Sequence, residues 1–337
     1  PPIIPATMDQ DLSFATLRML AKISGTNNNN VCWTVLLMTS SRIFYTLLSV
    51  KQRSTSWQCR TRVVSLESPT LVGILNVTPD SFSDGGKFVD VRQATEHALA
   101  LEEAGAAIID IGGESTRPGA SRISAEDQIA RTEPVIRSIR EQSKVCISID
   151  TTLAEVARVA LTAGADIIND VSAGTEDVSM FSLAAETGAG LVLMHRRLPP
   201  ELDQYCDQYE SSPESDDIVK DVLDWLEIRI SAAMATGVSE SAIAIDPGLG
   251  FGKSVEQNWQ LVHEINRITE LGYPVYVGAS RKSFIGANVG LDIPKLRDEA
   301  SVEVAKKMAD SGAQIFRVHN VSGHVRVLQS HLAQPEP

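Results

Sequence analysis

Short apolar runs that end in polar, glycine-containing loops recur along this chain. The first, from Leu71 to Val77, is followed by a loop rich in Thr, Pro, Asp and Ser that closes at Gly86. Runs of the same form lie in segments 106–119, 145–152, 165–174, 190–197, 242–253, 273–283 and 314–323. Uninterrupted apolar runs of this length are typical of strands that are buried on both faces. The pattern therefore predicts eight buried strands.

Segments with helical periodicity separate these strands. From Val91 to Gly105, apolar residues recur at intervals of three and four, and the glycine marks the end of the helix. The same periodicity is found in segments 125–142, 153–164, 178–188, 218–237, 255–272, 296–312 and 323–332. This alternation within about 265 residues predicts an α/β protein with a (β/α)8 barrel, or TIM barrel. The alternative, a doubly wound open sheet, seldom contains eight regular units.

Polar residues at the ends of the predicted strands are candidates for a functional site, because a (β/α)8 barrel builds its active site at the carboxyl ends of its strands. After the first six strands they are mainly acids and amides: Asn76, Asp110, Asp150, Asn169, Asp170 and Asp246. After the last two strands they are mainly basic: Arg281, Lys282, Arg317 and His319. Acids and amides suit a neutral heterocycle with several N–H and C=O groups, whereas cations suit a phosphate or a carboxylate.

The first 69 residues differ in kind from the rest. From Leu12 to Leu66 there is no Asp or Glu, whereas seven Lys and Arg residues stand among many Ser and Thr residues. This composition is typical of organelle transit peptides, so a mitochondrial location is one expectation. A cytoplasmic location is the other. A linker or a fragment of an upstream domain is the alternative, since the chain begins with Pro1. We expect residues 1–69 to form an irregular extension and residues 70–333 to form the barrel domain.

Composition and charge exclude several classes of function. Residues 31–50 are apolar, but Arg42 and several hydroxyl residues make membrane insertion costly, so no membrane partner is expected. The net charge of −13 argues against a nucleic-acid partner. The four cysteines show no C-x-x-C spacing, which argues against a zinc site and a disulfide framework. Segment 246–254 is not a P-loop, because Pro247 stands where that motif requires its first glycine.

Seven segments together resemble dihydropteroate synthase. In chain order they are NVTPDSFSDGG (76–86), DIGGESTRPG (110–119), SIDT (148–151), IND (168–170), DPGLGFGK (246–253), SRKS (280–283) and RVHNV (317–321). The resemblance implies a transferase of folate biosynthesis that joins 6-hydroxymethyl-7,8-dihydropterin diphosphate to p-aminobenzoate and releases pyrophosphate. It also implies Mg²⁺ as cofactor, sulfonamides as inhibitors and a homodimer. In the eukaryotic type the barrel is often fused behind a hydroxymethyldihydropterin pyrophosphokinase, which would make the protein multifunctional.

The resemblance also assigns roles to individual residues. The pterin-binding residues would be Asp150, Asn169, Met194, Asp246, Lys282 and Arg317. The diphosphate would be bound by Asn76, Arg117, Arg317 and His319, and Asn76 would also serve the Mg²⁺ ion. p-Aminobenzoate and sulfonamides would contact Phe82, Thr116, Arg117, Pro118 and Ser283. The residues expected to take part in catalysis are Asn76, Asp150, Lys282, Arg317 and His319.

The leaving group indicates the mechanism. Pyrophosphate that departs from the carbon beside an electron-rich dihydropterin leaves a positive charge that the ring can delocalise. An SN1-like path is therefore expected, in which the protein contributes placement and charge stabilisation rather than a nucleophile.

Two other functions stay open at this point. A methyltetrahydrofolate-dependent methyltransferase barrel would also use Asp150, Asn169 and Asp246, but it would not explain the basic cluster or the loop at 76–86. A non-catalytic barrel module of a folate multienzyme is the second alternative.

Several polar residues have a structural interpretation beside the functional one. Asp170 is expected to brace a turn, and Asp110 is a candidate for fixing loop amides. For His195, a structural role and a ligand contact are equally open. Residues 196–200 (RRLPP) lack the glycine that the family usually has there, so a different path is expected for this loop.

Overall fold

The computed structural model of the chain describes residues 18–27, 30–39, 42–51, 53–78, 87–291 and 293–328. It divides into two compact units, one of Pro1–Ser54 with Glu270–Gly272 and one of Thr55–Thr269 with Tyr273–Pro337. The first unit contains an antiparallel sheet of β1 (Arg18–Asn27), β2 (Asn30–Thr39) and β3 (Arg42–Lys51). Irregular structure was expected for this segment, but its many β-branched and aromatic residues favour strands. In the part of the chain that the structure describes, no helix has the length and apolarity needed to cross a bilayer.

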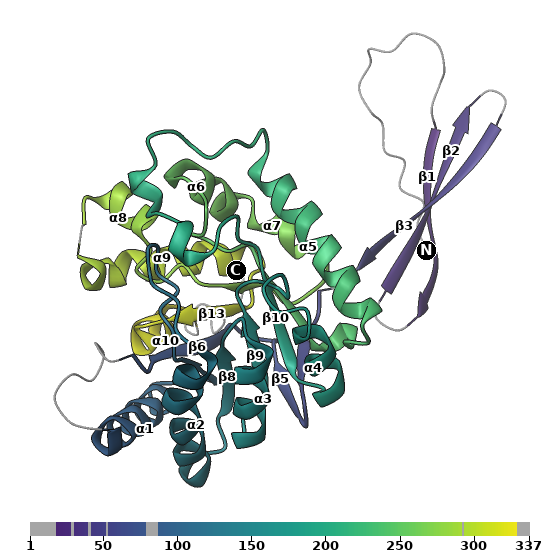
Figure 1. Cartoon of the computed structure of the whole chain (residues 1–337). Coiled ribbons are helices and arrows are strands. Elements are labelled where there is room, and N and C mark those ends of the chain that lie inside the picture. The colour runs from purple at the N-terminus through teal and green to yellow at the C-terminus, as the bar shows by residue number, and fades with distance from the viewer. Residues whose placement is uncertain are drawn as a thin grey trace. The chain divides into compact units, whose positions relative to one another are not determined.

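Eight parallel strands form the barrel of the second unit (Figure 1). They are β6 (Thr70–Asn76), β7 (Ile108–Gly112), β8 (Cys146–Asp150), β9 (Ile167–Asp170), β10 (Gly190–Met194), β11 (Ile243–Asp246), β12 (Tyr276–Val277) and β13 (Ile315–Val318). Their order in the sheet is β11-β10-β9-β8-β7-β6-β13-β12. An isolated parallel bridge between Ile245 and Val275 joins the two ends of this order. The predicted (β/α)8 barrel is confirmed.

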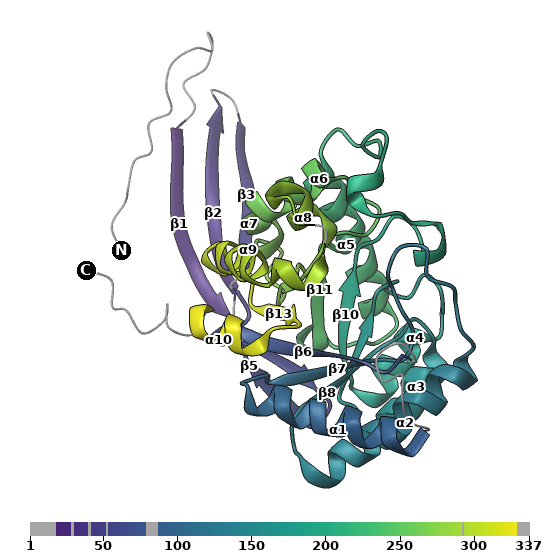
Figure 2. The same ribbon diagram turned by 90° about the vertical axis from the view of Figure 1, so that its left-hand side faces the viewer.

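Helices surround these strands, with α1, α2 and α3 lying along β6, β7 and β8 (Figure 2). The α-helices are α1 (Lys87–Glu103), α2 (Ala125–Gln142), α3 (Ala154–Ala163), α4 (Met180–Thr187), α5 (Ile218–Ala235), α6 (Val255–His263), α7 (Ile265–Thr269), α8 (Ser283–Val289), α9 (Asp298–Asp310) and α10 (Val321–Leu328). Short 3-10 helices are η2 (Pro200–Leu202), η3 (Cys206–Gln208), η4 (Glu240–Ala242) and η5 (Pro294–Arg297). The helix predicted at 255–272 is divided into α6 and α7. Helix α8 was not predicted, because its seven residues are too few to show an apolar stripe.

Side-chain caps determine where two of these helices begin. The Asp217 carboxylate accepts hydrogen bonds from the backbone N–H groups of Val219 and Lys220, both at 3.0 Å, at the start of α5. Ser254 and Gln257 form a capping box at the start of α6. Such caps satisfy N–H groups that have no partner within the helix.

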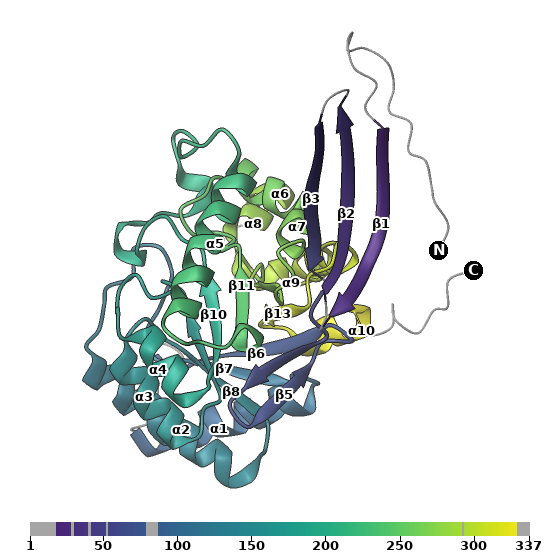
Figure 3. The same cartoon turned by 90° about the vertical axis from the view of Figure 1, so that its right-hand side faces the viewer.

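A hairpin closes the amino-terminal end of the barrel (Figure 3). Its strands are β4 (Ser56–Cys59) and β5 (Arg62–Ser65). Trp57 is fully buried in a core cluster with the first residues of the barrel strands, and its Nε1–H donates to the Ala242 carbonyl at 2.7 Å. A Cβ atom at Gly190 would lie 2.7 Å from Cys59 Sγ, so the close approach of the hairpin requires glycine there. The sequence placed the start of the barrel domain at residue 70, and the compact unit begins at Thr55.

The register of the strands divides the barrel interior into two layers. The lower layer, near the hairpin, is mostly apolar and contains Val72, Ile108, Cys146, Ile167, Val192, Ala244, Tyr276 and Ile315. Side chains alternate along a strand, so each inward-facing residue is followed two positions later by another. The upper layer is therefore Ile74, Asp110, Ser148, Asn169, Met194, Asp246, Gly278 and Arg317. An apolar base thus supports a polar layer at the carboxyl ends of the strands.

The hairpin gives a stability prediction. We expect Trp57→Ala to lower the free energy of unfolding by about 3 to 5 kcal/mol, because it removes a fully buried indole and its hydrogen bond to Ala242. Urea denaturation followed by circular dichroism measures this change. Val63→Ala in the same hairpin is the matched control, since Val63 is 64% exposed. A loss below about 1 kcal/mol for Trp57→Ala would show that the hairpin does not support the barrel.

Candidate active site at the carboxyl ends of the barrel strands

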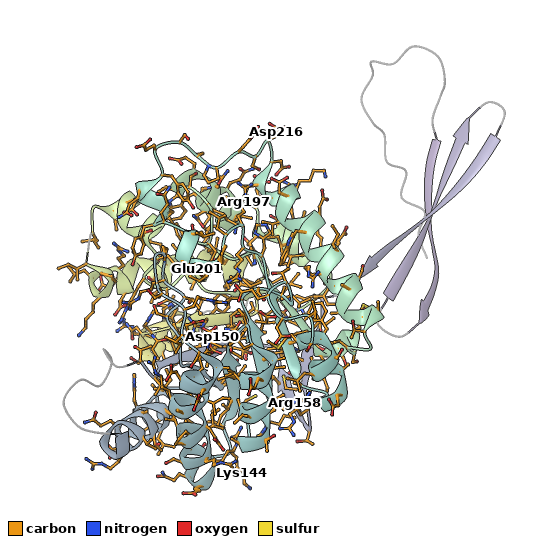
Figure 4. The ribbon with its side chains drawn as sticks, in the orientation of Figure 1. Lys144, Asp150, Arg158, Arg197, Glu201 and Asp216 are labelled. Carbon is orange, nitrogen blue, oxygen red and sulfur yellow. The ribbon has the colours of Figure 1, made fainter. Side chains whose placement is uncertain are left out.

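One cavity of about 530 Å³ opens at the carboxyl ends of the strands. It brings together most of the residues predicted from the sequence: Asn76, Thr116, Arg117, Pro118, Asp150, Asn169, Met194, Asp246, Lys282, Ser283, Arg317 and His319. Phe82 lies outside the described residues. Figure 4 shows Asp150 in the interior of the barrel unit and Lys144, which precedes the same strand, at its outer edge. The carboxyl end of β8 therefore lies inside the barrel unit, whereas the residue shortly before this strand lies at its surface.

Arg317, on β13, forms part of the floor of this cavity, by which we mean the side chains that line it from the ends of the strands. Its Nε–H donates to Asp110 Oδ2 at 2.6 Å, and its Nη2–H donates to Asp150 Oδ2 at 2.8 Å. Burial alone would lower the pKa of Arg317, but the two carboxylates outweigh it and raise the pKa above its usual value. Burial raises the pKa of the Asp150 carboxyl to about 7, although Arg317 opposes this shift. The three residues thus form a buried charge cluster in which Arg317 stays charged.

Asn169 is held in the same network. Its side-chain N–H donates to Asp110 Oδ2 at 3.2 Å, so Asp110 bonds both Asn169 and Arg317. Asp110 itself is fully buried and does not line the cavity. Its role is to orient two residues that do line it. A structural role was expected for Asp110, but its hydrogen-bond partners among the described residues are these side chains rather than loop amides.

Asp246 and Lys282 form the opposite side of the floor. Asp246 Oδ1 accepts the N–H of Gly248 at 2.7 Å. Gly248 has a φ of +66°, and a Cβ atom there would lie 1.7 Å from the His195 carbonyl oxygen, so this turn requires glycine. Burial raises the pKa of Asp246 to about 6, which the Gly248 N–H and the Lys282 charge oppose. Burial lowers the pKa of Lys282 to about 8, and its Nζ lies 3.8 Å from the centre of the Phe251 ring.

His319 stands at the rim, after β13. Its Nδ1 lies 3.0 Å from Ser280 Oγ, and its backbone N–H donates to the same oxygen at 3.2 Å. Burial, together with the charges of Arg281 and Arg317, lowers the pKa of His319 to about 3. The imidazole is therefore neutral near pH 7. Its Nε2 atom, when it carries the proton, is available as a neutral hydrogen-bond donor.

The loop after β7, residues 113–124, forms one wall of the cavity. Its Gly119 N–H donates to the Pro200 carbonyl at 2.8 Å, which links it to the loop after β10. At its far end, Arg122 bonds Glu114 at 3.1 Å and also bonds Glu176. Arg196, whose side chain is only 6% exposed, bonds the other oxygen of Glu176. We call Glu114, Arg122, Glu176 and Arg196 the loop clamp, because they join the loops after β7, β9 and β10.

The loop clamp explains the unusual loop after β10. In the segment RRLPP, Arg196 bonds Glu176 and the Pro200 carbonyl accepts from Gly119. These contacts use an arginine side chain and the carbonyl of Pro200 at the start of the 3-10 helix η2, rather than a glycine turn. The structure thus shows how the loop is anchored without the glycine that was expected.

Two residues of the stretch after β10 that lie at or near the cavity were not predicted from the sequence. Tyr205 lines the cavity and is 39% exposed. Cys206 is buried, and its Sγ lies 2.7 Å from Ser283 Oγ. Both stand in the acidic stretch after β10, which has no motif or periodicity that could have identified them.

Three strand-end residues have structural roles. Asp170 accepts hydrogen bonds from Ser172 and Gly174 and so braces its turn, as expected. His195 is buried, lies outside the cavity lining and packs edge-on against Trp225 at 5.1 Å. Lys253 is fully buried and donates to the carbonyls of Gly248 and Phe251 at 2.8 and 3.0 Å. It therefore closes the loop after β11, and it does not line the cavity.

The described residues offer few ligands for a metal ion in the cavity. Among the residues that the structure describes, no group of three His, Cys, Asp or Glu side chains is arranged to hold a metal ion. Asn76 lines the cavity and offers one side-chain carbonyl oxygen. A single such ligand suits Mg²⁺, which keeps most of its waters and takes further oxygen ligands from substrate phosphates.

Comparison with known proteins places this site in a family. The family model described as "Pterin binding enzyme" matches residues 72–319. Dihydropteroate synthase of Streptococcus pyogenes is 46% identical over 255 residues, which are 75% of this chain and 91% of that protein.

Solved structures agree with this match. Dihydropteroate synthase of Xanthomonas albilineans, solved with 4-aminobenzoic acid, superposes with a TM-score of 0.76 at 40% identity and covers 84% of this chain and 100% of its own. The Yersinia pestis enzyme, solved with a sulfonamide drug complex, has a TM-score of 0.75 at 37% identity. The match covers 82% of this chain and 98% of that chain. The chain therefore belongs to the pterin-binding enzymes, in the dihydropteroate synthase family of transferases.

Proposed function

We propose that this chain joins 6-hydroxymethyl-7,8-dihydropterin diphosphate to p-aminobenzoate, forming 7,8-dihydropteroate and pyrophosphate. The observation that carries this proposal is the division of one cavity into a floor of acids and amides and a rim of cations. A pterin and a diphosphate are the two parts of this substrate, and each matches one part of the cavity. A methyltransferase would have no use for the cations Arg117 and Arg317 or for the neutral donor His319.

The floor supplies the groups that a pterin ring requires. One carboxylate oxygen of Asp246 accepts the N–H of Gly248, and this bond fixes the plane of the carboxylate. The Asn169 side chain is oriented by its hydrogen bond to Asp110. Asp150 and Lys282 add an acceptor and a donor, and the buried Met194 gives an apolar contact for the ring. These groups are held by the protein before ligand binds, so little ordering free energy is lost on binding.

The rim supplies positive charge and hydrogen-bond donors for the departing diphosphate. Arg317 joins floor and rim, because its guanidinium is bonded to Asp110 and Asp150 while its side chain lines the cavity. Arg117 is exposed on the loop after β7 and can reach the phosphate oxygens from outside. His319 contributes a neutral donor. Fixed donors of this kind stabilise charge that develops on the leaving oxygen.

The reaction follows an SN1-like path in this proposal. The bond between the pterin methylene carbon and the diphosphate oxygen breaks, and both electrons leave with pyrophosphate. The amine nitrogen of p-aminobenzoate then forms the new C–N bond and releases one proton to solvent. Asp150 and Asp246 stabilise the cationic pterin by their negative charge, and the chain needs no covalent intermediate.

Asn76 is the residue that would hold Mg²⁺, through its side-chain oxygen. When bound there, the ion would neutralise part of the charge of the diphosphate oxygens. The remaining ligands would come from the substrate and from water, in keeping with the single oxygen that the protein offers.

p-Aminobenzoate and sulfonamides would bind between the loop after β7 and the start of α8. Thr116 and Pro118 line the cavity on one side, and Ser283 lines it on the other. Phe82, which belongs to the same proposed pocket, lies outside the described residues. The Gly119 to Pro200 bond and the loop clamp hold the Thr116 side of this pocket in position.

Three finer expectations complete the proposal. The chain would be of the eukaryotic type, behind a pyrophosphokinase domain in a multifunctional protein. It would act as a homodimer, and it would reside in the cytoplasm or in mitochondria. The upstream coding sequence, light scattering of the purified protein and microscopy of a fluorescent fusion test these three points in turn.

The activity is tested by measuring pyrophosphate release. We expect release from 6-hydroxymethyl-7,8-dihydropterin diphosphate that depends on p-aminobenzoate and yields dihydropteroate in equal amount. Absence of release with both substrates and Mg²⁺ would support the non-catalytic module instead. Methyl transfer from methyltetrahydrofolate would support the methyltransferase.

Asp246 gives a pH-dependent prediction. A pterin that donates two N–H bonds needs the ionised carboxylate, so its affinity should fall as the pH drops below about 6, the pKa to which burial raises Asp246. Asp246→Asn should weaken pterin binding by about 1 to 3 kcal/mol at pH 8 and flatten this part of the profile. Calorimetric titration with 6-hydroxymethylpterin measures both effects. The control is Asp216→Asn at an exposed position, and wild-type affinity in Asp246→Asn would remove Asp246 from the site.

His319 and Mg²⁺ give a prediction that separates the two halves of the substrate. We expect His319→Ala to weaken binding of the dihydropterin diphosphate about tenfold, which corresponds to about 1.4 kcal/mol, and to leave 6-hydroxymethylpterin binding unchanged. A chelator should have the same selectivity, because the ion would serve only the diphosphate. His263→Ala, at an exposed position in α6, is the control. Equal losses for both ligands would contradict the assignment of His319 to the leaving group.

A further inference from the structure

Tyr276 is a buried tyrosine whose hydroxyl group the proposed mechanism does not use. It lies on β12, is 2% exposed and forms part of the cavity wall. Its hydroxyl oxygen is inaccessible to solvent and has no hydrogen-bond partner among the residues that the structure describes. A buried hydroxyl without a partner costs free energy, so packing alone does not account for it.

The ring and the hydroxyl of Tyr276 belong to different surroundings. The ring packs in the lower apolar layer, with Val72, Ile108 and Ile315. Ile315 is the register partner of Tyr276, and Arg317 follows two positions later in the layer above. Because tyrosine is longer than its aliphatic neighbours, its hydroxyl extends toward the polar layer. A phenylalanine would fill the apolar layer equally well.

Other polar atoms at this level of the barrel are also buried without a hydrogen-bond partner among the described residues. Asp110 Oδ1, Asp150 Oδ1 and Ser148 Oγ are buried without a hydrogen-bond partner in the described part of the chain. Asp110 and Ser148 are register partners on β7 and β8, and Asp150 follows Ser148 on the same face. Several buried polar atoms without a partner therefore lie at this level of the barrel interior, and one of them belongs to Asp150, which is proposed to bind the pterin.

We propose that the Tyr276 hydroxyl is a specificity-determining group of the heterocycle pocket, which takes its hydrogen-bond partner from the bound ring. This inference rests on the proposed function, since it assumes that the ring is a pterin. The pocket would then recognise the heterocycle from below, through Tyr276, as well as from the side, through Asp246 and Asn169. A heterocycle without a polar atom on that edge would leave the hydroxyl buried and unpaired, and the site would discriminate against it.

The test uses Tyr276→Phe, which removes one oxygen atom and keeps the ring. We expect its affinity for 6-hydroxymethylpterin to fall about tenfold, and its urea midpoint without ligand to equal or exceed that of the wild type. Its affinity for inorganic pyrophosphate should stay within twofold, because the rim is untouched. The matched control is Tyr273→Phe, three residues earlier, whose hydroxyl bonds Glu240 at 3.3 Å and lies outside the cavity lining. That variant should keep its pterin affinity.

Each other outcome overturns the proposal. A pterin affinity within twofold of the wild type would show that the hydroxyl does not meet the ring, whatever its effect on stability. Equal losses for pterin and pyrophosphate would show a general distortion of the site. If the wild type itself binds no pterin, the proposed function fails. That result is distinct from a pterin-binding wild type whose Tyr276→Phe variant binds equally well.

Discussion

The buried contact of Arg317 with Asp110 and Asp150 is the interaction on which the site depends. It joins three strands, β13, β7 and β8, at the level where the barrel interior changes from apolar to polar. Removing these charges from water is expensive, and only their mutual attraction and close hydrogen bonds offset that cost. Loss of one member would leave the others uncompensated. The same contact orients Asn169 through Asp110, so the charge cluster also determines the shape of the floor.

Much of the fold could be predicted because strands buried on both faces are continuous apolar runs. The position of the site followed, since parallel strands bring their carboxyl ends to one edge, and residues as distant as Asn76 and His319 meet in one cavity. The partners within the site could not be predicted in this way. Asp110 and Arg317 are 207 positions apart, and nothing local indicates their contact. The position of Pro247 excluded a P-loop around Lys253, but nothing local indicated that backbone carbonyls enclose its ammonium group.

The floor of the cavity and its wall near Thr116 are held in place by different interactions. The floor rests on strands whose backbone hydrogen bonds fix each residue, whereas the wall near Thr116 is a loop held by side-chain ion pairs. Glu176 receives both Arg122 and Arg196, and the second of these is nearly buried. Salt screens exposed ion pairs more strongly than buried ones, so the partly exposed ion pairs of Arg122 in this loop are more sensitive to ionic strength than the buried charge cluster of the floor. Binding of the two substrates should accordingly respond differently to ionic strength.

The hairpin that closes the barrel has a consequence for how this polypeptide can be divided. Its indole bonds the residue directly before β11, the strand that ends in Asp246. A gene shortened to begin at the first barrel strand would encode all the residues of the pocket and yet leave the lower layer of the interior open to water. Such a product would expose Val72, Ile108 and Ile315 and would tend to aggregate during synthesis. The limits of a catalytic domain are thus determined by what seals its core, and they lie outside the segment that carries its chemistry.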